Sequence, residues 1–237
     1  MNVSIIICSL NSVDDHIHKI NSRNSKGLSY EIIVCSDITT RGLDNVRYVT
    51  DPKTSVKAFN LCYKQSSGDF VFTFPGGVTT RDDMFDMVYY LNSLKYKASA
   101  FSGDGGDPSW IPRWAAKKAY NNKKGLEKLC GRCQQQAQLQ NMYRLYRSQI
   151  LRYPAFHRDF IENYLGGVIF NESFIHHYVD NWLGVFCGKH FGSIENSSLR
   201  IVTEKHKSIH KYNKHDEQIF DKLLQNADPY NYNYKVY

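Results

Sequence analysis

Short apolar segments alternate with polar ones along the first half of the chain, and each apolar segment has the length of a β-strand. The clearest is residues 69–77, Asp-Phe-Val-Phe-Thr-Phe-Pro-Gly-Gly, in which aromatic and β-branched residues favour a strand and Pro75-Gly76-Gly77 ends it. Its nearly unbroken hydrophobicity is typical of a strand buried on both faces, at the centre of a parallel sheet. We therefore expect the residues after Phe74 to lie at the carboxyl edge of a sheet, where open α/β folds bind their ligands.

The segments around this strand predict a regular alternation of strands and helices. We expect strands at residues 3–8, 31–35, 46–49 and 98–102, and helices from about Val13, over residues 54–66 and from about Arg81. In the last of these helices, Met84, Phe85, Val88 and Leu91 recur at helical spacing. Because the links are short, the alternation predicts an α/β fold with a right-handed, doubly wound and mostly parallel sheet.

The second half of the chain begins with a strongly basic segment. Residues 114–152 contain nine lysines and arginines and one glutamate, a larger excess than the net charge of +7 on the whole chain. The second part of this segment has the apolar spacing of an amphipathic helix. Further along we expect a strand around Gly166-Gly167, another at 199–202, and a closing helix from Asp216 to about Gln225, which His215 and Asp216 cap.

Composition narrows the class of partner and the location. With 237 residues the chain can bury a substantial core, and its net charge of +7 and isoelectric point near 9.0 favour anionic partners. Nucleotide sugars, nucleic acid and an anionic membrane surface all fit this charge, as does a merely solvated basic surface. No apolar run approaches the roughly 20 residues of a transmembrane helix, so any membrane contact is expected to be peripheral. Cys8, Cys35 and Cys62 fall in or beside apolar segments, which predicts free buried thiols and a cytoplasmic location.

Five short motifs follow one another in the order found in a known family. They are Val3 to Asn11, Glu31 to Asp37, Ala58-x-Asn60, Ser67 to Phe70 and Thr80 to Met84. Together they resemble the family 2-like glycosyltransferases of the GT-A fold. The resemblance implies one GT-A-like, Rossmann-like domain over residues 1–237, in which residues 1–110 bind a nucleotide sugar. Residues 111–237 would bind the acceptor, with the basic helical segment 114–152 on that side.

The resemblance also implies which residues contact the donor. Ser9 and Asn11 form the polar exit of the first strand, and Asn60 belongs to the helix before the central strand. Asp37, at the end of the second strand, corresponds to the residue that receives the nucleotide base, and its carboxylate can accept a hydrogen bond from the imide N–H of uracil. A UDP-sugar is therefore the expected donor. The alternative for Asp37 is a residue that hydrogen-bonds its own turn.

The metal-binding motif of the family is missing. Members usually carry Asp-x-Asp at the end of the central strand, where this chain has Pro75, Gly76 and Gly77. A divalent cation normally neutralises the departing diphosphate, and proline and glycine offer no side-chain oxygen to Mg²⁺ or Mn²⁺.

Three explanations remain open for this gap. Cationic side chains replace the metal, or Asp104 and Asp107 hold a displaced one, or the protein binds without catalysing transfer. We favour the first, with Gly76 and Gly77 letting the backbone approach the diphosphate. The cationic candidates are Arg81, Arg113, Lys189, Lys205 and Lys207.

Asp180 is the candidate general base. Residues 178–183, Tyr-Val-Asp-Asn-Trp-Leu, resemble a late acidic motif of the family whose carboxylate deprotonates the acceptor hydroxyl in inverting members, although Val179 stands where a glutamate is common. The alternative is a helix N-cap. Trp182 would stack on a sugar or lie in the core. The remaining acceptor-side candidates are Gly166, Gly167, Lys117, Lys118, Arg144 and Arg147.

These features predict a nucleotide-sugar-dependent, inverting glycosyltransferase with an anionic acceptor. Sugar transfer to a modified DNA base would explain the basic segment 114–152, and a glycan or lipid-linked sugar would explain it nearly as well. A different class stays open: a catalytically degenerate GT-A domain that binds nucleic acid or glycan.

Overall fold

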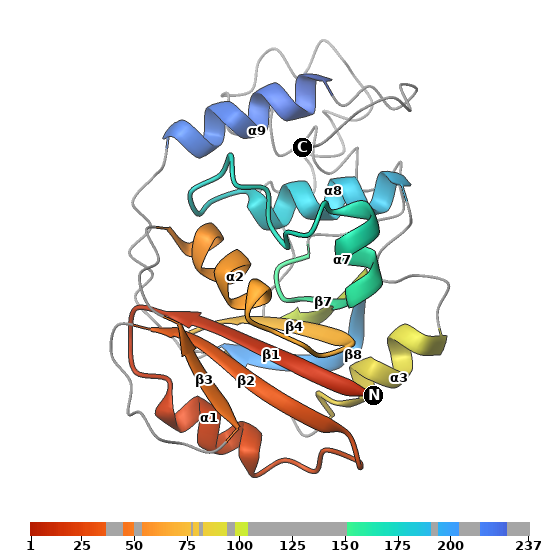
Figure 1. The fold of residues 1–237 in the computed structure, drawn as a ribbon. Coiled ribbons are helices and arrows are strands. Elements are labelled where there is room, and N and C mark those ends of the chain that lie inside the picture. Colours follow the sequence, from red (N-terminus) through yellow and green to blue (C-terminus); the bar gives the residue numbers. More distant parts are fainter. Residues whose placement is uncertain are drawn as a thin grey trace.

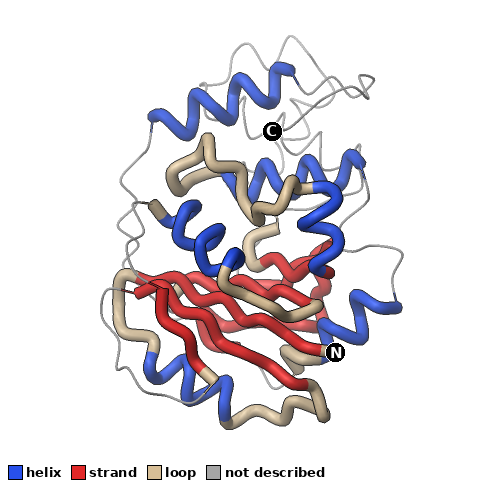
Figure 2. Tube along the Cα trace, viewed as in Figure 1, coloured by secondary structure: helices blue, strands red, loops and turns tan. Residues whose placement is uncertain are grey.

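In the part of the chain that the computed structural model describes, the strands form one eight-stranded sheet with helices on both faces (Figures 1 and 2). The structure describes residues 1–36, 45–49, 54–76, 78–80, 83–93, 98–103, 151–190, 194–203 and 214–226. The strands are β1 (Asn2–Ser9), β2 (Ser29–Ser36), β3 (Val46–Val49), β4 (Phe70–Pro75), β5 (Val78–Thr80), β6 (Ala98–Gly103), β7 (Pro154–His157) and β8 (Ile194–Thr203). The helices are α1 (Asp14–Asn21), α2 (Ser55–Lys64), α3 (Asp86–Ser93), α7 (Arg158–Tyr164), α8 (Val179–His190) and α9 (Lys214–Asn226).

The strands follow the order β3-β2-β1-β4-β7-β6-β8-β5 across the sheet. β1 pairs in parallel with β2 and β4, β2 with β3, and β6 with β8. β7 runs antiparallel between β4 and β6, and β5 runs antiparallel to β8. Six of the eight described strands therefore point the same way, and the prediction of a mostly parallel sheet is confirmed. The carboxyl ends of these six strands share one edge, called the carboxyl edge below.

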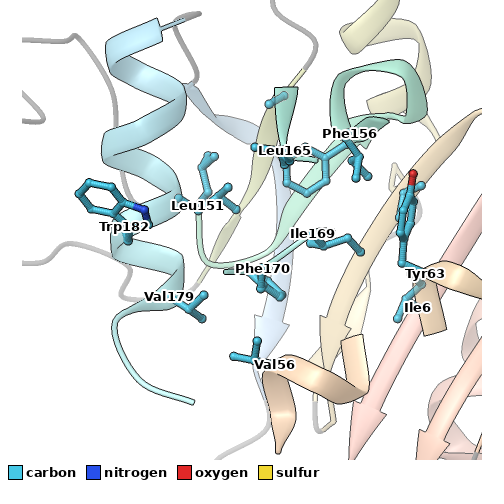
Figure 3. Packing of buried hydrophobic residues seen from close by; sticks show 14 of the residues in the cluster. Ile6, Val56, Tyr63, Leu151, Phe156, Leu165, Ile169, Phe170, Val179 and Trp182 are labelled. Carbon is cyan, nitrogen blue, oxygen red and sulfur yellow. The ribbon is translucent and has the colours of Figure 1, made fainter. Parts of the chain in front are cut away.

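Each face of the sheet has its own core. In β1, Ile6 and Cys8 point to one face, while Val3, Ile5 and Ile7 point to the other, as the two-residue period of a strand requires. Side chains of α2, α7 and α8 complete the first core, part of which Figure 3 shows, and α1 and α3 complete the second. The doubly wound arrangement is thus confirmed, and each fully buried large side chain contributes about 1.5–3 kcal/mol to it.

The central strand has the burial that its composition predicts. Phe70, Phe72 and Phe74 point toward the core of α1 and α3, and Val71 points toward the core of α2, α7 and α8. All four are at most 1% exposed. This two-sided burial explains why the sequence shows no polar alternation here.

Two predicted elements differ from the structure. The helix expected from about Arg81 begins at Asp86, because the preceding residues form a tight turn in which Asp86 N donates to Asp83 O (3.0 Å). The strand expected around Gly166-Gly167 is wrong. These glycines have φ of +69° and +76° and end helix α7, where Gly167 N donates to Ile161 O (3.1 Å). Left-handed backbone of this kind favours glycine, which is the reason for the pair.

The other elements predicted within the described residues agree with the structure, with small differences in length, whereas the amphipathic helix expected in the basic segment 114–152 lies outside the described residues. β3 has the predicted bounds, β8 extends beyond the predicted 199–202, and α9 begins two residues before Asp216. Cys8, Cys35 and Cys62 are buried free thiols, as is Cys187, and the sulfurs of Cys8 and Cys62 lie 4.0 Å apart. Within the part of the chain that the structure describes, no helix combines the length and apolarity needed to cross a membrane.

Candidate functional site

Polar residues gather at the carboxyl edge, beyond β1 and β2. Ser9, the last residue of β1, accepts a hydrogen bond from Asn11 N at its Oγ (3.0 Å). Ser36, the last residue of β2, donates through its Oγ to Asn11 O (2.8 Å). The backbone of Asn11 is therefore fixed between the ends of two neighbouring strands, and the exposed Asn11 side chain lies at the sheet edge where the sequence places the donor.

Gly76 lies against Ser9, directly after β4. Its N–H donates to Cys8 O (2.8 Å), which extends the pairing of β1 with β4 by one bond. A Cβ added at Gly76 would overlap Ser9 Oγ and Ser9 Cβ. The glycine is thus required by the Ser9 side chain, and its N–H is committed to the sheet. The expectation that Gly76 leaves room for a diphosphate is corrected at this residue, because Ser9 fills the space.

The residues at the end of β4 do not fit a divalent cation. Pro75 and Gly76 have no side-chain oxygen, and among the described residues no group of three His, Cys, Asp or Glu side chains is arranged to hold a metal. Several predicted site residues lie outside the described ranges. They are Asp37, Gly77, Arg81, Asp104, Asp107, Arg113, Lys117, Lys118, Arg144, Arg147, Lys205 and Lys207.

Asn60 is not placed to contact a donor. Its side chain is 1% exposed, its Oδ1 accepts from Ile169 N and Phe170 N (both 3.0 Å), and its Nδ2 donates to Phe170 O (2.8 Å) and Glu172 Oε1 (3.1 Å). An amide side chain has two donor hydrogens and two acceptor lone pairs, so these four bonds use its full capacity. Asn60 therefore joins α2 to the segment after α7, which corrects its assignment to the donor site.

The antiparallel strand β7 brings a distant segment to the carboxyl edge. Phe72 pairs with Ala155, and Thr73 Oγ1 donates to Pro154 O (3.0 Å), so the residues just before Pro154 lie beyond the carboxyl end of β4. Leu151 N donates to Asp180 O (3.3 Å). Asp180 consequently lies at the same edge as Gly76, although the two residues are far apart in the sequence.

The Asp180 carboxylate lies in a partly buried, positively charged setting. Its side chain is 26% exposed, and Arg152 Nε is 3.9 Å from its Oδ2. Burial raises the pKa of this carboxyl above its ordinary value, and Arg152, the Asn181 N–H and His176 oppose the rise. The carboxyl is therefore a stronger base than an exposed aspartate. Asp180 is the second residue of α8, so the N-cap alternative is wrong, but the helix dipole still favours its charge.

His176 lies near Asp180 and contacts the beginning of α2. Its Nδ1 is 2.6 Å from Ser55 Oγ, and Ser55 Oγ also donates to Ile175 O (3.2 Å). Because a hydroxyl has one hydrogen, both bonds form together only when His176 Nδ1 carries a proton. No local signal in the sequence identifies His176, because it lies in the loop before α8, where a spacing of four residues from Asp180 does not place two side chains on one face. Arg152 was missed as an individual residue because it ends a long basic segment.

Three acceptor-side candidates lie within the described residues, and each has a structural role. Trp182 is 3% exposed and belongs to the core cluster of α8, near Leu151 and Val179 (Figure 3). This is the core alternative, and it leaves no ring face for a sugar. Gly166 and Gly167 form the turn after α7 described above.

Comparison with known proteins identifies the fold. No protein-family model and no curated protein matches the sequence. Among solved structures, the chain is similar to the mannosyltransferase PcManGT from Pyrobaculum calidifontis in complex with GDP-Man and Mn²⁺ (14% identity, TM-score 0.55). It is also similar to S. aureus TarS residues 1–349 in complex with UDP-GlcNAc (11%, 0.56). A third similar structure is glucosyl-3-phosphoglycerate synthase from Mycobacterium tuberculosis in complex with Mn²⁺ and UDP-glucose (14%, 0.56).

Each of these likenesses covers 94% of this chain. In turn, the chain spans 61%, 65% and 78% of the three proteins, less than two thirds of the first two. At such identities the likeness shows the fold alone. The chain has a GT-A-like glycosyltransferase fold, as the ordered motifs of its N-terminal part predict.

Proposed function

We propose that this chain transfers a sugar from a nucleotide-sugar donor to a hydroxyl group of an acceptor, with Asp180 as the general base. The position of Asp180 carries the proposal: a partly buried carboxylate lies at the sheet edge that also holds Ser9, Asn11 and Gly76. The similar structures were determined with GDP-Man, UDP-GlcNAc and UDP-glucose, which supports a nucleotide sugar as the donor and favours UDP. Asp37, which follows Ser36 in the sequence, is proposed to bind the base.

The reaction is a single displacement. The acceptor oxygen attacks the anomeric carbon, the bond from that carbon to the diphosphate oxygen breaks, and the nucleoside diphosphate leaves with the electron pair. The acceptor hydroxyl proton passes to the Asp180 carboxylate. Because attack and departure occur on opposite sides of the carbon, the configuration inverts. A base with a raised pKa suits this role, since proton transfer is most effective when the pKa of the base approaches the working pH.

Charge on the leaving diphosphate is proposed to be neutralised by side chains. The described residues at the end of β4 do not fit a metal, so no step passes through one. Arg81 follows β5 in the sequence, and Lys205 and Lys207 follow β8, a strand that ends at the carboxyl edge. Guanidinium and ammonium groups bind phosphate oxygens strongly in such settings.

The acceptor is proposed to be anionic. Arg152 lies beside the proposed base with 39% of its side chain exposed, so its guanidinium can bind a phosphate or carboxylate near the attacking hydroxyl. The net charge of +7 favours the same class of acceptor. DNA carrying a modified base and a phosphate-bearing glycan both meet this description. A steep loss of acceptor affinity between 50 and 200 mM salt, on the order of 10³-fold, would identify nucleic acid.

The test begins with binding and continues with turnover. Thermal unfolding is measured with UDP, GDP, CMP and dTDP sugars, and the true donor at 100 times its Kd should stabilise the fold by about 2.7 kcal/mol. Transfer and hydrolysis are then measured with EDTA and with Mn²⁺. Asp180→Asn should reduce transfer by about 10²–10⁴-fold and leave nucleotide binding unchanged.

Asp159→Asn is the matched control. Asp159 pairs with His157 (2.7 Å), which lies opposite Phe70 at the other edge of the sheet, so this variant should transfer normally. Equal rates in the two variants would contradict the role of Asp180. Stabilisation by a nucleotide sugar without any turnover would instead support the degenerate, binding-only protein.

A further inference from the structure

Helix α9 holds the loop before α8, residues 175–178, through a fully buried carboxylate. Asp216 is 0% exposed. Its Oδ1 accepts from Ile175 N (2.7 Å), and its Oδ2 accepts from His176 N (2.8 Å) and His177 N (2.7 Å). Three backbone donors around one carboxylate form charge-assisted bonds, which explains how the charge can be buried. Asp216, which the sequence suggests as a helix cap, therefore binds a different segment.

A second contact between α9 and this loop lies one residue further on. Tyr178 has a φ of +63°, in the left-handed region, and its ring stacks on Phe220 of α9 with 5.0 Å between centroids and 15° between planes. Tyr178 O accepts from Trp182 N (2.9 Å), a bond of the first turn of α8. The chain thus turns into α8 at the point where α9 contacts it.

The opposite side of the loop is held by α2. Ile175 O accepts from Ser55 Oγ (3.2 Å) and from Val56 N (3.5 Å), and Ser55 Oγ is 2.6 Å from His176 Nδ1. The N–H groups of residues 175–177 therefore point to α9, while a carbonyl and a side chain of the loop bond α2. In Figure 1, this loop lies between α2 and α9, before the beginning of α8.

We infer that Asp216 is a positioning residue for Asp180. Asp180 follows Tyr178 by two residues, so the place where α8 begins decides where its carboxylate lies. The bond from Leu151 N to Asp180 O holds the helix start from the β7 side, and Asp216 holds it from the α9 side. The catalytic consequence rests on the proposed function, whereas the placement of Asp180 can be measured without turnover.

The test compares Asp216→Asn with Asp221→Asn, which removes the same charge from the same helix. An asparagine replaces one acceptor oxygen with an NH₂ group, so at least one N–H of residues 175–177 loses its partner. Amide hydrogen exchange of these residues should become at least about tenfold faster in Asp216→Asn. The ¹³C titration of Asp180 should move toward the ordinary aspartate pKa, because water reaches its carboxylate while Arg152 and His176 keep acting on it. Asp221→Asn should change neither measurement.

Chemical rescue and turnover complete the experiment. Asp216→Ala with added formate should regain slow exchange and the wild-type Asp180 titration, whereas chloride at equal ionic strength should not. In transfer assays, Asp216→Asn should lower kcat by up to about 100-fold and leave the donor Kd unchanged, as expected for a misplaced base. Phe220→Leu, which retains the buried carboxylate, should shift the Asp180 titration in the same direction by less.

Faster exchange of residues 175–177 with an unchanged Asp180 titration would overturn the inference, as would no change in either. If Asp216 variants do not fold, an unchanged Asp180 titration in Phe220→Leu would overturn it, and a shifted one would support it. If the wild-type protein transfers no sugar, the proposed function fails, and the exchange and titration results still decide whether Asp216 places Asp180.

Discussion

The N-terminal strands and the layer formed by α8 and α9 are held in place by different kinds of interaction. β1, β2, β3 and β4 are joined by a continuous parallel ladder, and their buried side chains are almost all apolar. The layer formed by α8 and α9 also shares an apolar core, but the loops beside it are held by single polar side chains that bond distant backbone, namely Asn60 and Asp216. We therefore expect the sheet to tolerate apolar substitutions of similar shape, whereas the part that carries Asp180 should depend more on a few specific residues.

The largest effect on stability is expected from removing one of these polar side chains. Asn60→Ala leaves Ile169 N, Phe170 N and Phe170 O without their present partner. Each buried group that loses its partner costs about 1–3 kcal/mol, so we expect a loss of roughly 3 kcal/mol or more in the free energy of unfolding. Urea denaturation measures it. The control is Asn21→Ala, an exposed asparagine bonded to Tyr30, where about 0.5 kcal/mol is expected. Similar losses in both variants would contradict the comparison.

A smaller effect is expected where β1 and β4 meet. Gly76→Ala forces a Cβ into the Ser9 side chain and should destabilise the fold by about 1–3 kcal/mol. Ser9→Gly removes that side chain, so the double variant should recover part of the loss, which a double-mutant cycle measures. Recovery stays incomplete because Ser9 Cα remains 3.2 Å from the added Cβ. Purely additive effects would show that Ser9 is not the reason for the glycine.

The smallest effect is a contrast in pH dependence between two carboxyl groups. Burial alone would raise the pKa of Glu31, but the hydrogen bonds from Ser67 and Ser4 and the charge of Arg47 lower it below 4.5. Its stabilising contribution is present above pH 4.5 and lost as pH falls through the lower pKa of the folded state. Glu31→Gln should therefore cost about 1 kcal/mol at pH 7 and progressively less as pH falls below 4.5.

Asp180 should behave in the opposite way. Its raised pKa means that the folded state favours the protonated form, so its contribution is present below pH 3.8 and lost as pH rises through the folded pKa. Asp180→Asn should thus be more stable than the wild type at pH 7 and lose that advantage at acid pH, while transfer falls by about 10²–10⁴-fold. Unfolding free energies measured from pH 3 to 8 check both signs. The same sign for both variants would refute the assignment of one carboxylate to the scaffold and one to the site.

Within the described residues, sequence reasoning selects Ser9, Asn11, Gly76 and Asp180 at the carboxyl edge, but not the tertiary contacts that place them there. Asp180 could be selected because a carboxylate opens a helix late in a chain that resembles a known family. Gly76 was correctly placed after the central strand, but its neighbour Ser9 lies on another strand and could not be identified from a local pattern. Asn60 was assigned to the donor because it lies in a family motif, and its four bonds appear only when the segment after α7 folds over α2.

Local patterns in the sequence suffice to predict the strands β1 to β4, helices α1, α2 and α9, and the parallel character of the sheet, since the spacing of apolar residues is a local property. The folded chain alone shows that β7 enters the sheet antiparallel between β4 and β6, and that Arg152, His176 and Asp180 meet at the carboxyl edge. Those arrangements depend on which distant segments bury each other and satisfy each other's hydrogen bonds. No short stretch of sequence contains that information.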